Sequence, residues 1–246
     1  MALRSFAEGA VFAEAFGDGS PRVLALHGWG RRGADFKKSL VDVPALALDL
    51  PGFGASPPPA DVIGAHGYAD IVAPLLDEFD RPPVLIGHSF GGRIAVCLGA
   101  KYPENVGPIL LTGAPVVRAS AAKKPLLRYR VARSLSKIGL ISDERMETRR
   151  RKSGSADYRA ANGVMRDVLV KIVNESYEPE LGALQSHVLM IWGGKDLEVP
   201  VWVGEKAAEV IRNSGGSADL TVLEDVGHLL PTEAPDRLRI AVDSLL

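Results

Sequence analysis

The sequence predicts an α/β fold, in which a mostly parallel, twisted sheet carries helices on both faces. Two observations predict it. Short apolar runs alternate along the chain with longer amphipathic stretches, which is typical of β-α-β units. The apolar runs also lack the polar–apolar alternation of a strand with one face in water, as expected for strands covered on both sides. The 246 residues are enough for one large domain or for a core with an insertion.

Six apolar runs are the predicted strands of this sheet, at residues 22–26, 44–48, 84–86, 106–111, 188–192 and 220–223. A further strand over residues 11–16 is expected at the edge of the sheet. Apolar residues spaced by three and four predict amphipathic helices over residues 68–79, 201–211 and 234–245. Pro74 lies inside the first of these helices and is expected to kink it or to mark its first turn.

The region from 115 to 185 interrupts the strand–helix alternation. Leu127, Val131, Leu135 and Ile138 line one side of a predicted helix, and a second helix is expected from Met165 to Val173. Many of the basic residues also fall here, among them Lys123, Lys124, Arg128, Arg130, Arg133 and Arg149 to Lys152. A helical insertion between two core strands is best explained as a cap. We therefore expect a core of residues 1–114 and 186–246 with a helical cap over residues 115–185.

Composition narrows the class of protein. The net charge of −1 gives no reason to expect a nucleic-acid partner or a stable membrane insertion. No apolar run approaches the length of a bilayer span, and the first residues lack the apolar stretch of a signal peptide. The single cysteine, Cys97, is expected in the core and favours a reducing compartment. We expect a cytoplasmic protein, and the sequence predicts no particular oligomeric state.

Ser89 is the candidate nucleophile. It lies in Gly87-His88-Ser89-Phe90-Gly91, a G-x-S-x-G pattern between a predicted strand and a predicted helix. A sharp strand-to-helix turn holds such a serine side chain outward, and the flanking glycines let the backbone pass without a clash. The context of strand and helix makes the pattern more specific than its five residues alone.

A serine hydroxyl needs a base to remove its proton, and the base needs a carboxylate to orient it. His228 follows the last predicted strand and Asp196 follows the one before it, so both are expected at the carboxyl edge of the sheet with Ser89. We predict His228 as the general base and Asp196 as its partner. Glu198 and Asp225 are alternative acids, although Asp225 is close to His228 in sequence and poorly placed to reach its far nitrogen.

The third requirement is a pair of backbone donors for the negative charge that develops on the substrate oxygen. Phe90 directly follows the nucleophile and supplies one N–H. Trp29, in the turn His27-Gly28-Trp29-Gly30 after the first buried strand, is predicted to supply the other. We expect both residues to line the substrate pocket as well, the Trp29 indole covering one wall.

Taken together, these motifs resemble the α/β-hydrolase superfamily over the whole chain: His27-Gly28-Trp29-Gly30, Asp49-Leu50-Pro51-Gly52-Phe53-Gly54, Gly87 to Gly92, Gly194-Lys195-Asp196 and Gly227-His228. The resemblance implies a Ser89–Asp196–His228 triad, a Trp29/Phe90 oxyanion hole and a helical cap after the sixth strand. Within the superfamily the chain is similar to compact bacterial esterases and to meta-cleavage-product hydrolases. Dehalogenases and epoxide hydrolases of this fold carry aspartate where this chain has Ser89. Asp49 is expected to hold the turn that follows it.

The leading hypothesis is hydrolysis of small or medium carboxylic esters through an acyl-enzyme, with no metal or organic cofactor required. Two alternatives stay open. One is hydrolysis of a carbon–carbon bond, in which Arg159 or Arg166 of the cap would bind a dienoate carboxylate. The other is a sensor that holds a small molecule in the same pocket with slow or no turnover.

Overall fold

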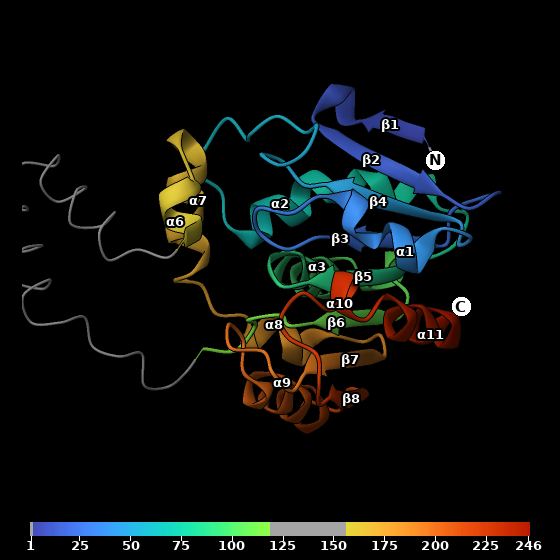
Figure 1. Ribbon diagram of the computed structural model, residues 1–246, viewed down its shortest axis with the longest axis vertical. Coiled ribbons are helices and arrows are strands. Elements are labelled where there is room, and N and C mark those ends of the chain that lie inside the picture. Colours follow the sequence, from blue (N-terminus) through green and yellow to red (C-terminus); the bar gives the residue numbers. More distant parts are fainter. Residues whose placement is uncertain (1, 119–155) are drawn as a thin grey trace, which may run out of the picture.

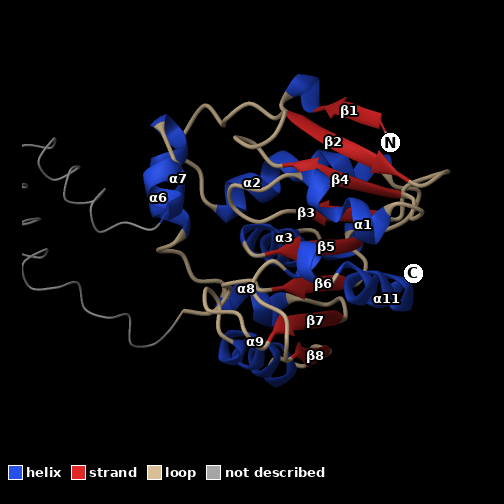
Figure 2. Cartoon of the chain, viewed as in Figure 1, coloured by secondary structure: helices blue, strands red, loops and turns tan. Residues whose placement is uncertain are grey.

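The computed structural model describes residues 2–118 and 156–246, and these contain one eight-stranded sheet (Figure 2). The strands are β1 (Ala2–Phe6), β2 (Val11–Phe16), β3 (Val23–Leu26), β4 (Ala45–Asp49), β5 (Val84–His88), β6 (Ile109–Thr112), β7 (Val188–Gly193) and β8 (Ala218–Leu223). Their spatial order is β1-β2-β4-β3-β5-β6-β7-β8. β2 pairs antiparallel with β1 and β4, and every other pairing is parallel. The predicted fold class is confirmed.

Helices cover both faces of the sheet (Figure 1). The described helices are α1 (Lys37–Leu40), α2 (Ala65–Val72), α3 (Phe90–Lys101), α6 (Ala156–Ala160), α7 (Gly163–Ile172), α8 (Glu178–Ala183), α9 (Val201–Asn213), α10 (Leu230–Glu233) and α11 (Pro235–Leu245). Leu24 and Leu26 belong to a buried cluster that includes residues of α2, α3, α8 and α9, whereas Val23 and Ala25 belong to a second cluster with residues of α1 and α11. The sheet is buried on both sides, which explains why its strands read as continuous apolar runs.

Two elements differ from their prediction. The strand expected at the edge over residues 11–16 exists, but β1 pairs with its outer side from Phe6↔Val11 to Ala2↔Ala15, so β2 is an internal strand. The helix expected over residues 68–79 is α-helical only to Val72 and continues as a 3-10 helix, Ala73–Glu78. Pro74 lies at the start of that second segment, where its missing N–H leaves no hydrogen bond unmade.

Part of the predicted cap is described. α6 and α7 lie beyond one end of the strands (Figure 1), and α8 packs against α3 and α9. The helix predicted around Leu127–Ile138 and most of the basic residues of this region lie outside the described residues. The division into core and cap therefore stays a prediction.

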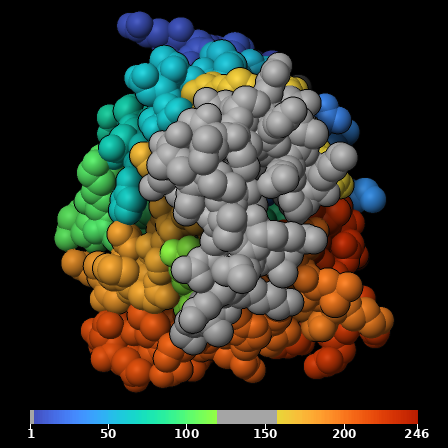
Figure 3. Space-filling model, turned by 90° about the vertical axis from the view of Figure 1, so that its left-hand side faces the viewer, coloured from blue at the N-terminus to red at the C-terminus, as the bar shows by residue number. Residues whose placement is uncertain are grey.

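The two edges of the sheet form opposite ends of the molecule. From the side that carries α6 and α7, the first strand is at one end and the chain after α8 is at the other (Figure 3). Within the described ranges, none of the helices combines the length and the apolar character needed to cross a bilayer.

Candidate active site

Ser89 lies at the turn between β5 and α3. Its backbone has φ 50° and ψ −111°, a conformation that costs a non-glycine residue about 1–3 kcal/mol. The Ser89 N–H donates to the Thr112 carbonyl of the neighbouring strand at 2.9 Å. Gly91 lets the turn pass close to β3, because a Cβ there would lie 2.2 Å from the Leu26 carbonyl oxygen. The strained turn holds the hydroxyl at the carboxyl edge of the sheet, as the sequence pattern predicts.

The side chains of Ser89, His228 and Asp196 form one chain of hydrogen bonds. His228 Nε2 lies 3.0 Å from Ser89 Oγ, and His228 Nδ1 lies 2.8 Å from Asp196 Oδ2. The side chains of His228 and Asp196 are 9% and 1% exposed. The structure thus brings together all three residues of the predicted triad, at positions 139 and 32 residues apart in the chain.

Asp196 is fixed from its other side. Its Oδ1 accepts hydrogen bonds from the backbone N–H groups of Glu198 at 2.9 Å and Val199 at 2.8 Å. These bonds orient the carboxylate, which can only accept a hydrogen bond from His228. The Nδ1 atom of His228 therefore carries the proton, and its Nε2 is free to accept one from Ser89.

The pKa of His228 is raised above its ordinary value. Burial opposes protonation, but the hydrogen bond and charge of Asp196 outweigh it, with smaller contributions from Glu198 and Glu233. The raised pKa means that the imidazolium is stabilised, which is the form that a general base reaches when it takes a proton. A base with this environment is suited to accept the serine proton.

The alternative acids have other partners. Asp225 pairs with Lys195 at 2.7 Å. Glu198 Oε2 lies 3.6 Å from His228 Nε2, on the side of the ring that faces Ser89 rather than on the Asp196 side. Glu233, which the sequence did not single out, accepts hydrogen bonds from the N–H groups of Gly227 and Leu229 and so braces the loop that carries His228.

Trp29 and Phe90, the predicted oxyanion-hole residues, lie together beside Ser89. Their ring centroids are 5.3 Å apart in an edge-to-face arrangement. Phe90 is the first residue of α3, where an N–H has no partner within the helix. Both residues line a cavity of about 190 Å³ together with Ser89 and His228. Its other lining residues are Arg93, Pro115, Asp157, Leu169, Ile172, Val173, Glu198 and Val199.

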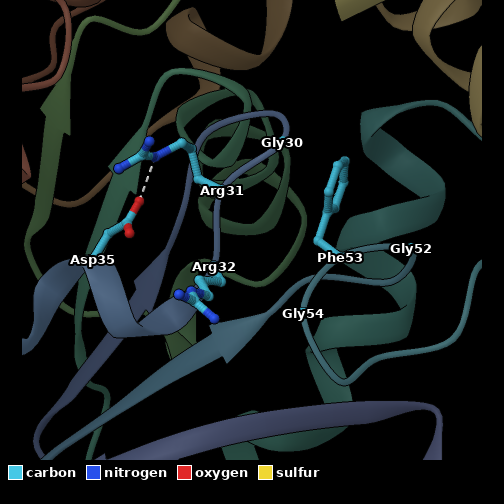
Figure 4. A pocket seen from close by; sticks show the side chains of 7 residues that line it. All are labelled: Gly30, Arg31, Arg32, Asp35, Gly52, Phe53 and Gly54. Carbon is cyan, nitrogen blue, oxygen red and sulfur yellow. Dashed lines mark hydrogen bonds and ion pairs between the residues drawn. The ribbon is translucent and has the colours of Figure 1, made fainter. Parts of the chain in front are cut away.

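A larger cavity, of about 580 Å³, lies between the turn at Gly30–Asp35 and the loop at Gly52–Gly54 (Figure 4). Arg31 and Asp35 form an ion pair on its wall. None of the three triad residues lines it. The chemistry therefore belongs to the smaller cavity, which contains both the hydroxyl and the imidazole.

Asp49 holds its turn as expected. Its Oδ1 accepts from the Gly33 N–H at 2.9 Å and its Oδ2 from the Ala55 N–H at 2.8 Å. Gly54 is required beside it, because its φ is +55° and a Cβ there would lie 2.0 Å from Asp49 Oδ2. The carboxylate of Asp49 thus fixes two loops and does not reach the cavity of Ser89.

The two arginines that the carbon–carbon hydrolase hypothesis assigns to a dienoate carboxylate, Arg159 and Arg166, are not among the described residues that line the cavity of Ser89. The Arg166 guanidinium lies over the Tyr158 ring at 5.6 Å. The cation that does line the cavity is Arg93, which sequence reasoning missed. The available signal was one charged side chain within the otherwise apolar first turns of the helix that follows Ser89.

Known proteins share this fold and sequence pattern. The model of the alpha/beta hydrolase family matches residues 23–241. The chain is 27% identical over 242 residues to the pimeloyl-[acyl-carrier protein] methyl ester esterase of Neisseria meningitidis, covering 86% of this chain and 88% of that protein.

It is 25% identical over 241 residues to the dihydrolipoyllysine-residue acetyltransferase component of the acetoin cleaving system of Pseudomonas putida, covering 90% of this chain but only 62% of that longer protein. Among solved structures, a meta-cleavage product hydrolase from Pseudomonas fluorescens shares the fold, with a TM-score of 0.66, 23% identity, and coverage of 95% of this chain and 93% of that one. The match of the family model over most of the chain shows that this protein belongs to the alpha/beta hydrolase family.

Proposed function

We propose that the protein is a serine carboxylesterase that cleaves esters of small or medium acyl groups through an acyl-enzyme. One observation carries the proposal: the unbroken hydrogen-bonded chain from Ser89 Oγ through His228 to Asp196 at the wall of a cavity. Similarity to an enzyme named as a methyl ester esterase supports the choice of an ester as the substrate.

In the proposed reaction, Ser89 Oγ attacks the carbonyl carbon of the ester while His228 Nε2 takes its proton. The N–H groups of Trp29 and Phe90 stabilise the oxyanion, and loss of one such donor typically lowers the rate about 10²–10³-fold. His228 then protonates the departing alcohol. A water molecule, deprotonated by His228, attacks the acyl-enzyme, and His228 returns the proton to Ser89 Oγ as the carboxylic acid is released.

The test is steady-state hydrolysis of p-nitrophenyl butyrate by wild type and three variants. Ser89→Ala and His228→Ala should lower kcat on the order of 10⁴-fold or more, and Asp196→Asn should lower it by about 10⁴-fold through the wrong imidazole tautomer. Asp225→Asn is the matched control, since this carboxylate lies in the same region but pairs with Lys195. Full activity of Ser89→Ala would contradict the proposal.

Turnover of a meta ring-fission product, measured beside turnover of the ester, separates the alternatives. A carbon–carbon hydrolase would turn over a meta ring-fission product much faster than any simple ester. A sensor would bind ligand with very slow multiple turnover even with the triad intact. A carboxylesterase would turn over the ester faster than the ring-fission product, and with many rapid turnovers rather than the slow ones of a sensor.

A further inference from the structure

One guanidinium shares the cavity with the nucleophile. Arg93 lies on α3 four residues after Ser89, and its part-buried side chain reaches the carbonyl of Ile172 at the end of α7. Among the described residues that line this cavity, it is the sole arginine or lysine. Besides apolar side chains, the cavity wall carries the carboxylates of Asp157 and Glu198, yet neither forms an ion pair with Arg93 among the described contacts. A part-buried cation calls for a partner, since an isolated charge is poorly tolerated away from water.

Within the part of the chain that it describes, the structure gives Arg93 no direct ion pair, although Tyr177 and the charge of Glu175 favour its charged form. Nη1 donates to the Ile172 carbonyl at 2.7 Å, and the guanidinium lies 5.9 Å from the centre of the Tyr177 ring. Nε is buried and has no hydrogen-bond partner in the described chain. None of the described carboxylates forms an ion pair with the Arg93 guanidinium. Toward the described residues, Arg93 thus has one unused donor, Nε.

The carboxylate whose charge acts on Arg93, Glu175, is already engaged. Glu175 Oε2 accepts from the Tyr177 hydroxyl at 2.8 Å and from the Ala65 N–H at 3.1 Å, which ties the end of α7 to the start of α2. Burial lowers the pKa of Arg93, yet a guanidinium stays charged in proteins. A carboxylate on a bound substrate would supply the missing anion with strong, charge-assisted hydrogen bonds.

The arrangement of charges indicates which part of the substrate carries that carboxylate. The leaving alcohol takes its proton from His228 Nε2, so it departs beside Glu198 Oε2, which is 3.6 Å from that nitrogen. A negative charge on the alcohol would be repelled there. The acyl side of a substrate would lie opposite, toward Arg93, and four residues of helix correspond to a rise of about 6 Å between Ser89 and Arg93.

We propose that Arg93 is a specificity-determining residue that binds a carboxylate at the far end of the acyl group. The substrates would be monoesters of short dicarboxylic acids. This inference rests on the proposed ester hydrolysis and names the substrate class of that site.

The test compares esters that differ only in this charge. Monomethyl glutarate and monomethyl adipate are matched with methyl 5-oxohexanoate and methyl 6-oxoheptanoate, in which a methyl ketone replaces the carboxylate. Wild type should prefer the acids by about 10-fold or more in kcat/KM, as hydrogen bonds to a charged group allow. Arg93→Met should bring the ratio to one or below and change hydrolysis of the ketones only a few-fold. Equal kcat/KM values in wild type would overturn the proposal.

Two controls separate recognition from a structural role. Glu175→Gln weakens the neighbouring connection between the end of α7 and α2 but keeps the cation of Arg93, so the preference should persist. If Arg93→Met lowers both substrates equally, Arg93 only holds the fold together and the proposal is wrong. Arg93→Lys keeps the charge without the planar donors and should retain a reduced preference, which decides the case if Arg93→Met does not fold.

Binding to Ser89→Ala, measured by calorimetry, needs no turnover. Preference for monomethyl glutarate over its ketone there, without hydrolysis by wild type, would reject the esterase and keep Arg93 as an anion site. Hydrolysis of both esters at equal kcat/KM would keep the esterase and reject Arg93 as an anion site.

Discussion

The imidazole of His228 meets a carboxylate at each nitrogen, Asp196 at Nδ1 and Glu198 near Nε2, with Glu233 and the neutral ring of His88 close by. A general base works in its neutral form, so kcat/KM should fall as the pH drops through the pKa of His228, which lies above its ordinary value.

Glu198→Gln removes a negative charge that favours the imidazolium, which lowers that pKa. We therefore expect the acid limb of the kcat/KM profile for p-nitrophenyl butyrate to move to lower pH. Glu209→Gln, on an exposed carboxylate paired with Lys206, should leave the profile in place. An acid limb that stays where it is, or moves to higher pH, would show that Glu198 does not act on His228.

At the same scale, the triad positions were predictable because each candidate follows a strand in a glycine-containing motif. The convergence of Ser89, His228 and Asp196 is observed, while their catalytic roles stay a prediction. Arg93 and Glu233 were missed, since their significance lies in contacts with Ile172 and Gly227 that linear spacing does not reveal. Glu198 was considered as a partner for Nδ1, but the loop directs it to the other nitrogen.

The elements of the core were predictable where local pattern and tertiary position agree. Runs such as Val188–Gly193 are apolar throughout because both faces are covered. β1 was missed: Ala2–Phe6 is short, contains Arg4 and is specified by pairing with β2 rather than by its own pattern. This strand displaced β2 from the edge. Pro74 marked the change from α-helix to 3-10 helix at Val72, one of the two outcomes that its chemistry allows.

Strand topology explains how distant residues meet. Ser89 follows β5, Asp196 follows β7 and His228 follows β8, and these strands run parallel through β6. Parallel strands place their carboxyl ends at the same edge, so each loop emerges at that edge. The order of strands therefore brings the hydroxyl, the imidazole and the carboxylate together.

For the molecule as a whole, two buried histidines link stability to pH. Burial lowers the pKa of His27 to about 4 and that of His88 to about 3. His27 Nε2 accepts from the Leu50 N–H, and His88 Nδ1 is hydrogen-bonded to Thr112. Below pH 6.5, His27 and His88 become protonated in the unfolded chain but stay neutral in the folded chain. The free energy of unfolding should therefore decrease as the pH falls toward 4.

Each of these histidines contributes a slope of about 1.4 kcal/mol per pH unit across that window. Urea denaturation from pH 7 to pH 4.5 measures it. His88→Gln removes one titrating group and should flatten the slope by about one proton relative to wild type. An unchanged slope would mean that His88 is protonated in the folded protein.

The central claim is that His228 and Asp196 activate the hydroxyl of Ser89. The most direct measurement is reaction with a fluorophosphonate, followed by mass spectrometry of the intact protein and of its peptides. We expect one adduct per chain, on Ser89, with labelling slowed by several orders of magnitude in His228→Ala. An adduct on another residue, or equally fast labelling of Ser89 without the imidazole, would contradict the account.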